Sequence, residues 1–122
     1  MTPLATPPPA YVIVDGVRRR LAQSSFCWRT TCADFVQARC GDGRTPTVRV
    51  RRGQRVRFRL GFDPTDVRLT YTGRLEVIYR VRFAPRRTVT WRVRLFAGRD
   101  EYVLFARAPL GDTSYAVCFK SR

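Results

Sequence analysis

Arginines and apolar residues alternate along residues 47–62, and this pattern constrains the fold more than any other part of the chain. Alternation with a period of two predicts β-strands that have one buried side and one solvent-facing side. The alternation stops at Arg52-Gly53-Gln54 and then resumes, and the glycine supplies the backbone freedom for a change of direction. The segment therefore predicts two strands joined by a sharp turn, with arginines along their outer side.

Short stretches with the same period cover most of the remaining chain. Asp15-Gly16 lies between two short apolar runs, residues 11–14 and 17–21, and predicts a tight hairpin. Residues 24–43 lack periodicity, so we expect a loop there. The other expected strands are residues 67–71, 75–83, 89–95, 102–108 and 114–120. Several short strands without helical periodicity predict an all-β fold, a two-layer immunoglobulin-like β-sandwich.

The end of the chain indicates the order of the strands. Residues 98–104 resemble the tyrosine corner that opens the penultimate strand of immunoglobulin-like sandwiches, although an ordinary buried Tyr102 would give the same pattern. In an immunoglobulin-like order the strands 54–60, 75–83 and 89–95 are neighbours in one sheet. Their outward side chains would then form one anion-binding face, made of Arg55, Arg57, Arg59, Arg80, Arg82, Arg92 and Arg94.

The strand expected at residues 102–108 differs from the others because both of its sides are apolar. A strand with two apolar sides is usually covered on both. We therefore expect the hairpin at residues 11–21 or the loop at residues 24–43 to cover Val103 and Phe105.

The first ten residues differ from the rest in composition. They contain four prolines, which favour an extended, semi-rigid segment that cannot pair as a strand. We expect residues 1–10 to be a linker and residues 11–122 to be a single domain, with the hairpin and the cysteine-containing loop in residues 11–46 and the core strands in residues 47–122. The segment after Met1 is not a basic and then apolar signal peptide, but proline-rich linkers of this kind commonly follow a signal or a membrane anchor. We therefore expect an extracytoplasmic protein, secreted or membrane-anchored through a removed N-terminal segment.

The charge of the chain is strongly one-sided. The 122 residues include 24 basic and 9 acidic residues, a formal net charge of +15, and Lys120 is the only lysine. A genome rich in G and C would account for arginine in place of lysine, but it explains less well why acidic residues are so few. A net charge of this size favours anionic partners, such as nucleic acid, acidic lipid or an anionic polymer.

The four cysteines are Cys27, Cys32, Cys40 and Cys118. Their spacing and the lack of histidine fit a zinc site poorly. Free buried thiols are a second alternative. An even count and loop positions favour two disulfides and therefore an oxidising compartment, but four cysteines allow three pairings.

Several short motifs resemble a known family. Three prolines, a short hairpin, Ser25-Phe26-Cys27-Trp28 and Cys32-Ala33-Asp34 follow one another here. This order resembles small uncharacterised extracytoplasmic proteins of Gram-positive bacteria, secreted or lipid-anchored, which carry a Ser-Tyr-Cys-Trp and a Cys-Ala-Asp motif ahead of an immunoglobulin-like half. The phrases V-x-R-G-Q-x-V-x-F-x-L and Y-V-L-F-A-R-A … S-Y-A-V-C-F here look like the rest of that pattern.

The chain departs from that family at two points. Phe26 stands where the family usually has tyrosine, and Cys40 and Cys118 are additions. The resemblance implies a bridge between Cys27 and Cys32, which leaves Cys40 to pair with Cys118. Because the family has no assigned activity, the resemblance implies location and fold rather than function.

The residues present argue against catalysis. The chain has no histidine, which removes the commonest general base and the commonest metal ligand. Most acidic residues lie at predicted turns, where aspartate serves the backbone. No glycine-rich phosphate loop opens a helix. We therefore expect no enzyme activity, no cofactor and no metal.

Binding functions remain. We expect a non-catalytic extracytoplasmic binding or adhesion module that recognises an anionic polymer, acidic lipid head groups or a partner protein through the arginine face. The alternative is a single-stranded nucleic-acid-binding β-domain, although the aromatic side chains point mostly inward, away from a stacking platform. In a third interpretation the arginines only keep the surface soluble, and recognition lies in the loop around Phe26 and Trp28.

Overall fold

The structure is a computed structural model that describes residues 6–122. The described chain is built from β-strands alone, so the all-β prediction is confirmed, and no helix in it is long and apolar enough to cross a bilayer. The strands are β1 (Tyr11–Val14), β2 (Val17–Arg20), β3 (Ala22–Trp28), β4 (Thr31–Ala33), β5 (Thr47–Val50), β6 (Arg55–Arg59), β7 (Asp66–Tyr71), β8 (Arg80–Phe83), β9 (Thr88–Arg92), β10 (Arg99–Ala108) and β11 (Gly111–Ser121).

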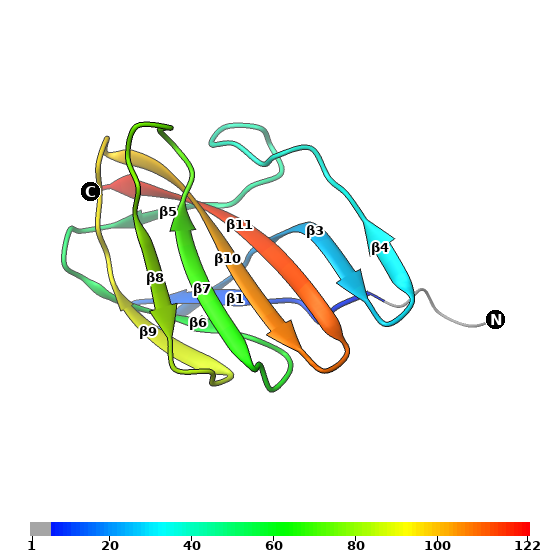
Figure 1. The fold of residues 1–122 in the computed structure, drawn as a ribbon. Helices are drawn as coiled ribbons and strands as arrows, with labels where there is room; N and C mark the ends of the chain where they lie inside the picture. The colour runs from blue at the N-terminus through cyan, green and yellow to red at the C-terminus, as the bar shows by residue number, and fades with distance from the viewer. Residues whose placement is uncertain (1–5) are drawn as a thin grey trace.

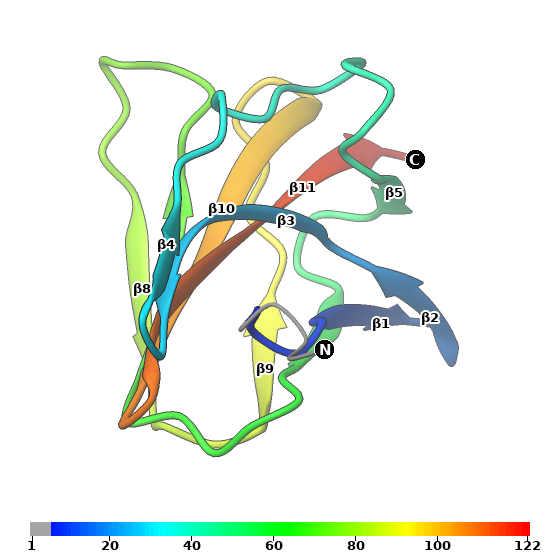
Figure 2. The ribbon, with the colours of Figure 1, turned by 90° about the vertical axis from the view of Figure 1, so that its right-hand side faces the viewer.

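These strands form two sheets that pack face to face (Figures 1 and 2). The smaller, sheet A, has the order β2-β1-β6-β9. The larger, sheet B, has the order β4-β3-β11-β10-β7-β8, and β5 pairs in parallel with the end of β11. Figure 1 looks onto the outer face of sheet B, with β1, β6 and β9 behind it. The predicted two-layer sandwich is therefore confirmed.

The space between the sheets is filled by the alternating apolar residues. Val12, Val56 and Phe58 of sheet A face Leu104 and Phe119 of sheet B, and all are at most 1% exposed. Aromatic rings join the layers: Trp91 of β9 lies 4.9 Å from Tyr102 and 5.4 Å from Phe119, measured between ring centroids. Burial of this apolar area is the main term that stabilises the sandwich.

The turn predicted at Arg52-Gly53-Gln54 carries the chain from one sheet to the other. β5 belongs to sheet B and β6 to sheet A. Gly53 has a φ of 80°, which disfavours any residue with a side chain, and its N–H donates to the carbonyl of Val93 at 2.8 Å. The predicted change of direction is thus confirmed.

The predicted hairpin is also confirmed. β1 and β2 pair across a two-residue loop, with Val14 opposite Val17. Asp15 and Gly16 have φ values of 49° and 78°. Two consecutive positive φ values are typical of the type I′ turn, whose twist matches that of paired strands.

Two predictions about strands are wrong. Residues 24–43 are not simply a loop, because β3 pairs with β11 and β4 pairs with β3. The strand expected at residues 75–83 begins only at Arg80, Leu75 is fully exposed, and β8 pairs with β7 in sheet B. It is therefore not a neighbour of β6 and β9, as an immunoglobulin-like order would require.

The expected linker is only partly described, since residues 1–5 lie outside the described residues. Residues 6–10 are not a free linker. Pro7 and Ala10 are buried, the Ala10 carbonyl accepts a hydrogen bond from Leu21 N at 2.9 Å, and the Tyr115 hydroxyl donates to the Pro8 carbonyl at 2.6 Å. The Leu21 bond extends the pairing of β1 with β2, and the Tyr115 bond fastens the start of the described chain to β11 of sheet B.

Both expected disulfides are present. Cys27 is bonded to Cys32, which closes the short connection between β3 and β4. Cys40 is bonded to Cys118, which ties the loop at residues 34–46 to β11. Two disulfides indicate an oxidising compartment.

The Tyr102 side chain makes the contact that a tyrosine corner would make. Its ring is buried, and its hydroxyl donates to the carbonyl of Arg94, eight residues upstream, at 2.6 Å. Burial is the main cause that raises the pKa of this phenol far above its ordinary value. The bond therefore joins the start of β10 to the segment that follows β9.

Candidate functional site

The outer face of sheet A carries a set of exposed arginines, which we call the sheet A arginine face. Its members come from three of the four strands of the sheet, and the pairing registers place them on one side. They are Arg18 and Arg20 of β2, Arg55, Arg57 and Arg59 of β6, and Arg92 of β9.

The register fixes how these arginines lie. Arg55 is directly opposite Arg92. The other β6 arginines oppose threonines of β9, and the guanidinium of Arg59 donates to Thr88 Oγ1 at 2.9 Å. Consecutive outward positions of a strand are about 6.8 Å apart, and four paired strands span about 14 Å. The charges are therefore spread over a broad surface rather than gathered at one point.

Strand β1 separates the arginines of β2 from those of β6. Its outward residues are Tyr11 and Ile13, both half-buried. The Arg18 guanidinium lies 4.3 Å from the centre of the Tyr11 ring, within the range of a cation–π contact. The face thus has an apolar centre that is partly covered by arginine.

No carboxylate is paired with these arginines among the described residues. Asp15, in the hairpin turn, is bonded to Arg122 at 2.7 Å, and Asp63, near the opposite end of β6, is bonded to Arg87 at 2.7 Å. The arginine hydrogen bonds lower the pKa of both carboxyls. In water, two unit charges 7 Å apart repel by about 0.6 kcal/mol, so this face opposes folding weakly and attracts anions.

The predicted single array of seven arginines is wrong, because its members lie in three places. Arg55, Arg57, Arg59 and Arg92 share the sheet A arginine face. Arg80 and Arg82 lie on β8 in sheet B. Arg94 lies over the rings of Tyr79 and Phe96, at 5.4 Å from each centre, near one end of the sandwich.

The sequence reasoning missed Arg18 and Arg20 as members of the face. The signal was present, because a two-residue hairpin turn fixes which β2 residues point the same way as Tyr11. The missing information was that β1 pairs with β6, a contact between distant parts of the chain.

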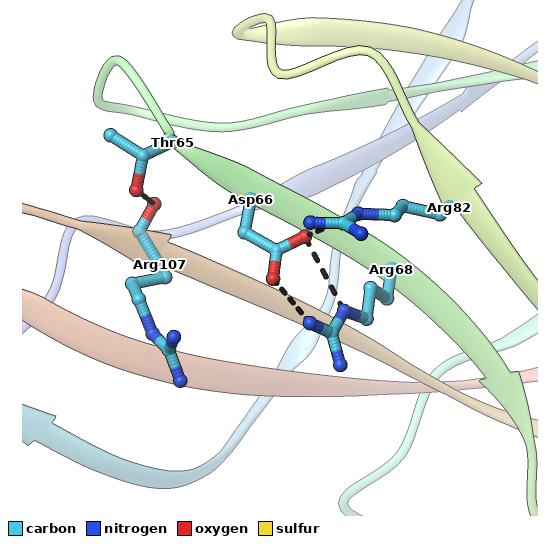
Figure 3. A network of polar contacts seen from close by, with 5 residues as sticks. All are labelled: Thr65, Asp66, Arg68, Arg82 and Arg107. Carbon is cyan, nitrogen blue, oxygen red and sulfur yellow. Dashed lines mark hydrogen bonds and ion pairs between the residues drawn. The ribbon is translucent and has the colours of Figure 1, made fainter.

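A second set of arginines surrounds one carboxylate on the outer face of sheet B (Figure 3). Asp66 of β7 is bonded to Arg68 at 2.7 Å and to Arg82 of β8 at 3.3 Å. Burial raises the pKa of this carboxyl, but the Arg68 hydrogen bond and the charges of Arg68, Arg82 and Arg107 lower it more, so the net pKa is below the ordinary value. We call these four residues the Asp66 cluster.

Phe105 of β10 adjoins this cluster. The Arg68 and Arg107 guanidiniums lie 5.9 Å and 5.6 Å from the centre of its ring. Phe105 and Val103 are only half-buried, and the groups over Phe105 are arginines rather than the expected hairpin or loop at residues 24–43. That loop reaches the same sheet elsewhere, where Ala38 packs on Ala116.

Phe26 and Trp28 do not form a loop site, and that prediction is wrong. Both lie on β3 and are buried, and Trp28 packs against Phe62 with ring centroids 4.9 Å apart. Their side chains belong to the core between the sheets, because the inward positions of β3 carry them there.

A groove of about 830 Å³ lies beside the sheet A arginine face. The loop at residues 34–46 forms one wall, with Phe35 and Arg44, and the β2–β3 region forms the other, with Arg19 and Arg20. The carboxylate of Asp42 accepts backbone hydrogen bonds from Arg39, Arg44 and Thr45, which hold the loop in shape and lower the pKa of that carboxyl. Arg20 is shared between the groove and the face.

The described residues contain no group of three histidine, cysteine, aspartate or glutamate side chains that could hold a metal ion. Comparisons of the chain with protein-family models, with curated proteins and with solved structures give no match.

Proposed function

We propose that the protein is a non-catalytic binding module that recognises an extended anionic polymer through the sheet A arginine face. The observation that carries this proposal is that six arginines share one face and that none of them is paired with a carboxylate in the described chain. Side chains with this spread fit a ligand with repeated charges better than a small anion.

The groove beside the face supports the same proposal. A polymer that crosses the outer face of sheet A at Arg20 would continue toward Arg44, whose guanidinium lies 5.8 Å from the centre of the Phe35 ring. The Phe35 ring offers an apolar surface between these charges. Such a mixture suits the backbone of a charged polysaccharide, whose rings alternate apolar and charged groups.

The proposed location is outside the cytoplasm. The two disulfides favour an oxidising compartment, and the resemblance to extracytoplasmic proteins of Gram-positive bacteria favours a secreted or lipid-anchored form. Acidic lipid head groups and a partner protein with an acidic surface are other ligands that this face would attract.

Single-stranded nucleic acid is the second candidate, and the outward position of Tyr11 favours it. Single strands bind where outward aromatic rings stack on bases beside basic side chains. The Arg18 guanidinium already covers the Tyr11 ring, however, so a base would have to displace it. We therefore rank single-stranded nucleic acid below a charged polysaccharide as the ligand of this face.

The proposal is tested by replacing one arginine of each contributing strand with glutamine, Arg18→Gln, Arg57→Gln and Arg92→Gln together. The matched control replaces Arg29, Arg39 and Arg49, which are exposed elsewhere on the molecule, and so removes the same charge. Heparin affinity is measured at several salt concentrations. The logarithm of the affinity falls linearly with the logarithm of the salt concentration. Each lost contact should make this slope shallower by about 0.7 to 0.9.

We expect heparin to raise the melting temperature of the wild type and the control at low salt, and the triple variant to lose most of this effect. Equal affinity and salt slope in the triple variant and the control would show that the face only solvates the sheet. An oligothymidine that binds more tightly than heparin and loses affinity in Tyr11→Ala would favour nucleic acid instead.

A further inference from the structure

The Asp66 cluster holds its arginines in a defined arrangement, unlike the sheet A arginine face. Asp66 is 7% exposed, and its carboxylate accepts a hydrogen bond from Arg68 Nε at 3.3 Å. Ion pairs place Arg68 Nη2 at 2.7 Å and Arg82 Nε at 3.3 Å from its oxygens. Figure 3 shows the guanidiniums of Arg68 and Arg82 at this carboxylate and that of Arg107, on the neighbouring strand β10, to one side of it. The carboxylate therefore orients guanidiniums whose like charges would otherwise separate.

The cluster carries more positive than negative charge. Arg68 lies directly opposite Arg82 across the β7–β8 pair, and Arg107 lies opposite Asp66 across the β10–β7 pair. The flanking charged residues on this face are Arg80 on β8 and Asp112 on β11. Four guanidiniums and two carboxylates leave an excess of two positive charges.

Several guanidinium donors of the cluster remain free for a ligand. A guanidinium has five N–H donors. Arg68 directs Nε and Nη2 toward Asp66, and Arg82 makes only an ion pair with it, through Nε. The Arg107 guanidinium donates to no protein group in the described chain and lies beside the Phe105 ring. The Arg82 side chain is 71% exposed, so a ligand can reach it.

We propose that Arg68, Arg82 and Arg107 form a binding site for a phosphate monoester, with Asp66 as the internal brace that positions Arg68 and Arg82. A phosphate monoester carries up to two negative charges and three terminal oxygens, which match the charge excess and the three guanidiniums. Arginine is suited to this role because its planar fork binds phosphate through two parallel hydrogen bonds. This site lies on the opposite outer face from the sheet A arginine face and does not depend on it.

The test follows the arginine side-chain signals by carbon-detected NMR during titration with glycerol phosphate at constant ionic strength. We expect saturable shifts of Arg68, Arg82 and Arg107.

The chain has no histidine, and Asp66 stays ionised, so the ligand is the only partner that titrates near neutral pH. Affinity should rise up to about tenfold from about pH 5 to about pH 8, because the second ionisation of a phosphate ester lies near pH 6. Inorganic sulfate, a dianion throughout, should bind equally at both pH values.

Single variants Arg82→Gln and Arg107→Gln should each weaken glycerol phosphate about tenfold or more. Both leave the bidentate Arg68–Asp66 pair in place, so the fold is retained. Arg49→Gln is the control that removes the same charge from β5. The variant Arg18→Gln/Arg57→Gln/Arg92→Gln should bind glycerol phosphate as the wild type does, which separates this site from the polymer-binding face.

The source of the phosphate group is resolved with vesicles that contain phosphatidic acid. If Arg82→Gln and Arg107→Gln weaken vesicle binding, the group is presented by a lipid headgroup. If they weaken only glycerol phosphate, it belongs to a soluble ester. Arginine signal shifts that do not saturate, or that chloride reproduces, would overturn the proposal. It would also be overturned if Arg82→Gln and Arg107→Gln both gave the same shifts as the control Arg49→Gln.

Discussion

The outer faces of the two sheets are both rich in arginine but hold it in different ways. On sheet A, six guanidiniums have no carboxylate partner among residues 6–122, and threonines and a tyrosine lie between them. On sheet B, the buried Asp66 pairs with the guanidiniums of Arg68 and Arg82, and Arg107 lies on the next strand. The first face suits a long ligand bound by many weak contacts, and the second suits one small group bound by a few oriented donors.

The same difference extends to how each sheet is stabilised. Both disulfides lie on the sheet B side, one between β3 and β4 and one between the loop at residues 34–46 and β11. Sheet A is held to its partner by apolar packing and by several chain crossings, among them the one at Gly53. We expect substitutions on the sheet B side to cost more free energy of unfolding than those on the outer face of sheet A.

The largest effect should come from removing the long disulfide. Cys40 and Cys118 are separated by 78 residues, and in the chain-entropy model this closure stabilises the fold by about 4 to 5 kcal/mol. The double substitution Cys40→Ala and Cys118→Ala should lower the urea midpoint accordingly. Removing the Cys27–Cys32 bridge, which spans 5 residues, should cost only about 2 kcal/mol. Equal losses for the two bridges would contradict the loop-closure explanation.

The next largest effect should come from Asp66→Ala. The substitution leaves Arg68 facing Arg82 with no carboxylate between them, and we expect a loss of about 2 kcal/mol in the free energy of unfolding. Since the folded-state pKa of Asp66 is lowered, its contribution is present above the ordinary value of 3.8 and is lost as the pH falls further. Asp63→Ala, which removes an exposed carboxylate near sheet A, should change stability little. A similar loss of unfolding free energy in Asp66→Ala and Asp63→Ala would contradict the difference between the two faces.

A smaller effect concerns the Tyr115 phenol on the inner side of sheet B. Burial raises its pKa from 10.0 to about 12, and its hydroxyl donates to the Pro8 carbonyl. The phenol ionises first in the unfolded chain, so its contribution is complete below pH 10 and falls by up to about 1.4 kcal/mol per pH unit above it. Tyr115→Phe should cost about 1 kcal/mol at neutral pH. It should also flatten the decline of the urea midpoint in alkali, and an unchanged decline would rule out this phenol as its cause.

The smallest effect should have the opposite sign. Arg57→Gln removes one charge from the sheet A arginine face without breaking a hydrogen bond among the described residues. Relief of repulsion should stabilise the fold by about 0.3 kcal/mol at low salt and by less at high salt. Arg68→Gln should instead destabilise it, because Asp66 loses its bidentate partner. If both substitutions shift the melting temperature in the same direction, the two faces do not differ as described.

Much of the fold could be predicted from local patterns. The hairpin followed from Asp15-Gly16, and the strands around Gly53 followed from alternation with arginine, because both signals act over a few residues. β3 was missed because its polar Ser24 and Ser25 coincide with a register shift in the pairing with β11, between Thr113 and Tyr115. An irregular pairing of this kind interrupts the period that identifies a strand.

The site was harder to predict, because it depends on which strands are neighbours. The alternation of β8 is the same whether it pairs with β6 or with β7, so the sequence could not place Arg80 and Arg82 in the right sheet. Asp66 directly follows the predicted turn Asp63-Pro64-Thr65, so the sequence indicated a turn residue there rather than a binding residue. Its role in orienting arginines became visible only with the pairings of β7 to β8 and to β10.

The Cys40–Cys118 bridge also divides the molecule into an extensible and a locked part under mechanical load. β5 to β10, and β11 up to Cys118, lie within the loop that the bridge closes. Tension between the two ends of the described chain would pass from Cys40 to Cys118 through the sulfur atoms and bypass that loop. The β1–β2 hairpin, the parts of β3 and β4 outside the Cys27–Cys32 bridge and the end of β11 could then be drawn out. Stretching would thus strip part of the sheet A arginine face while the enclosed strands, including the Asp66 cluster, stayed covalently confined.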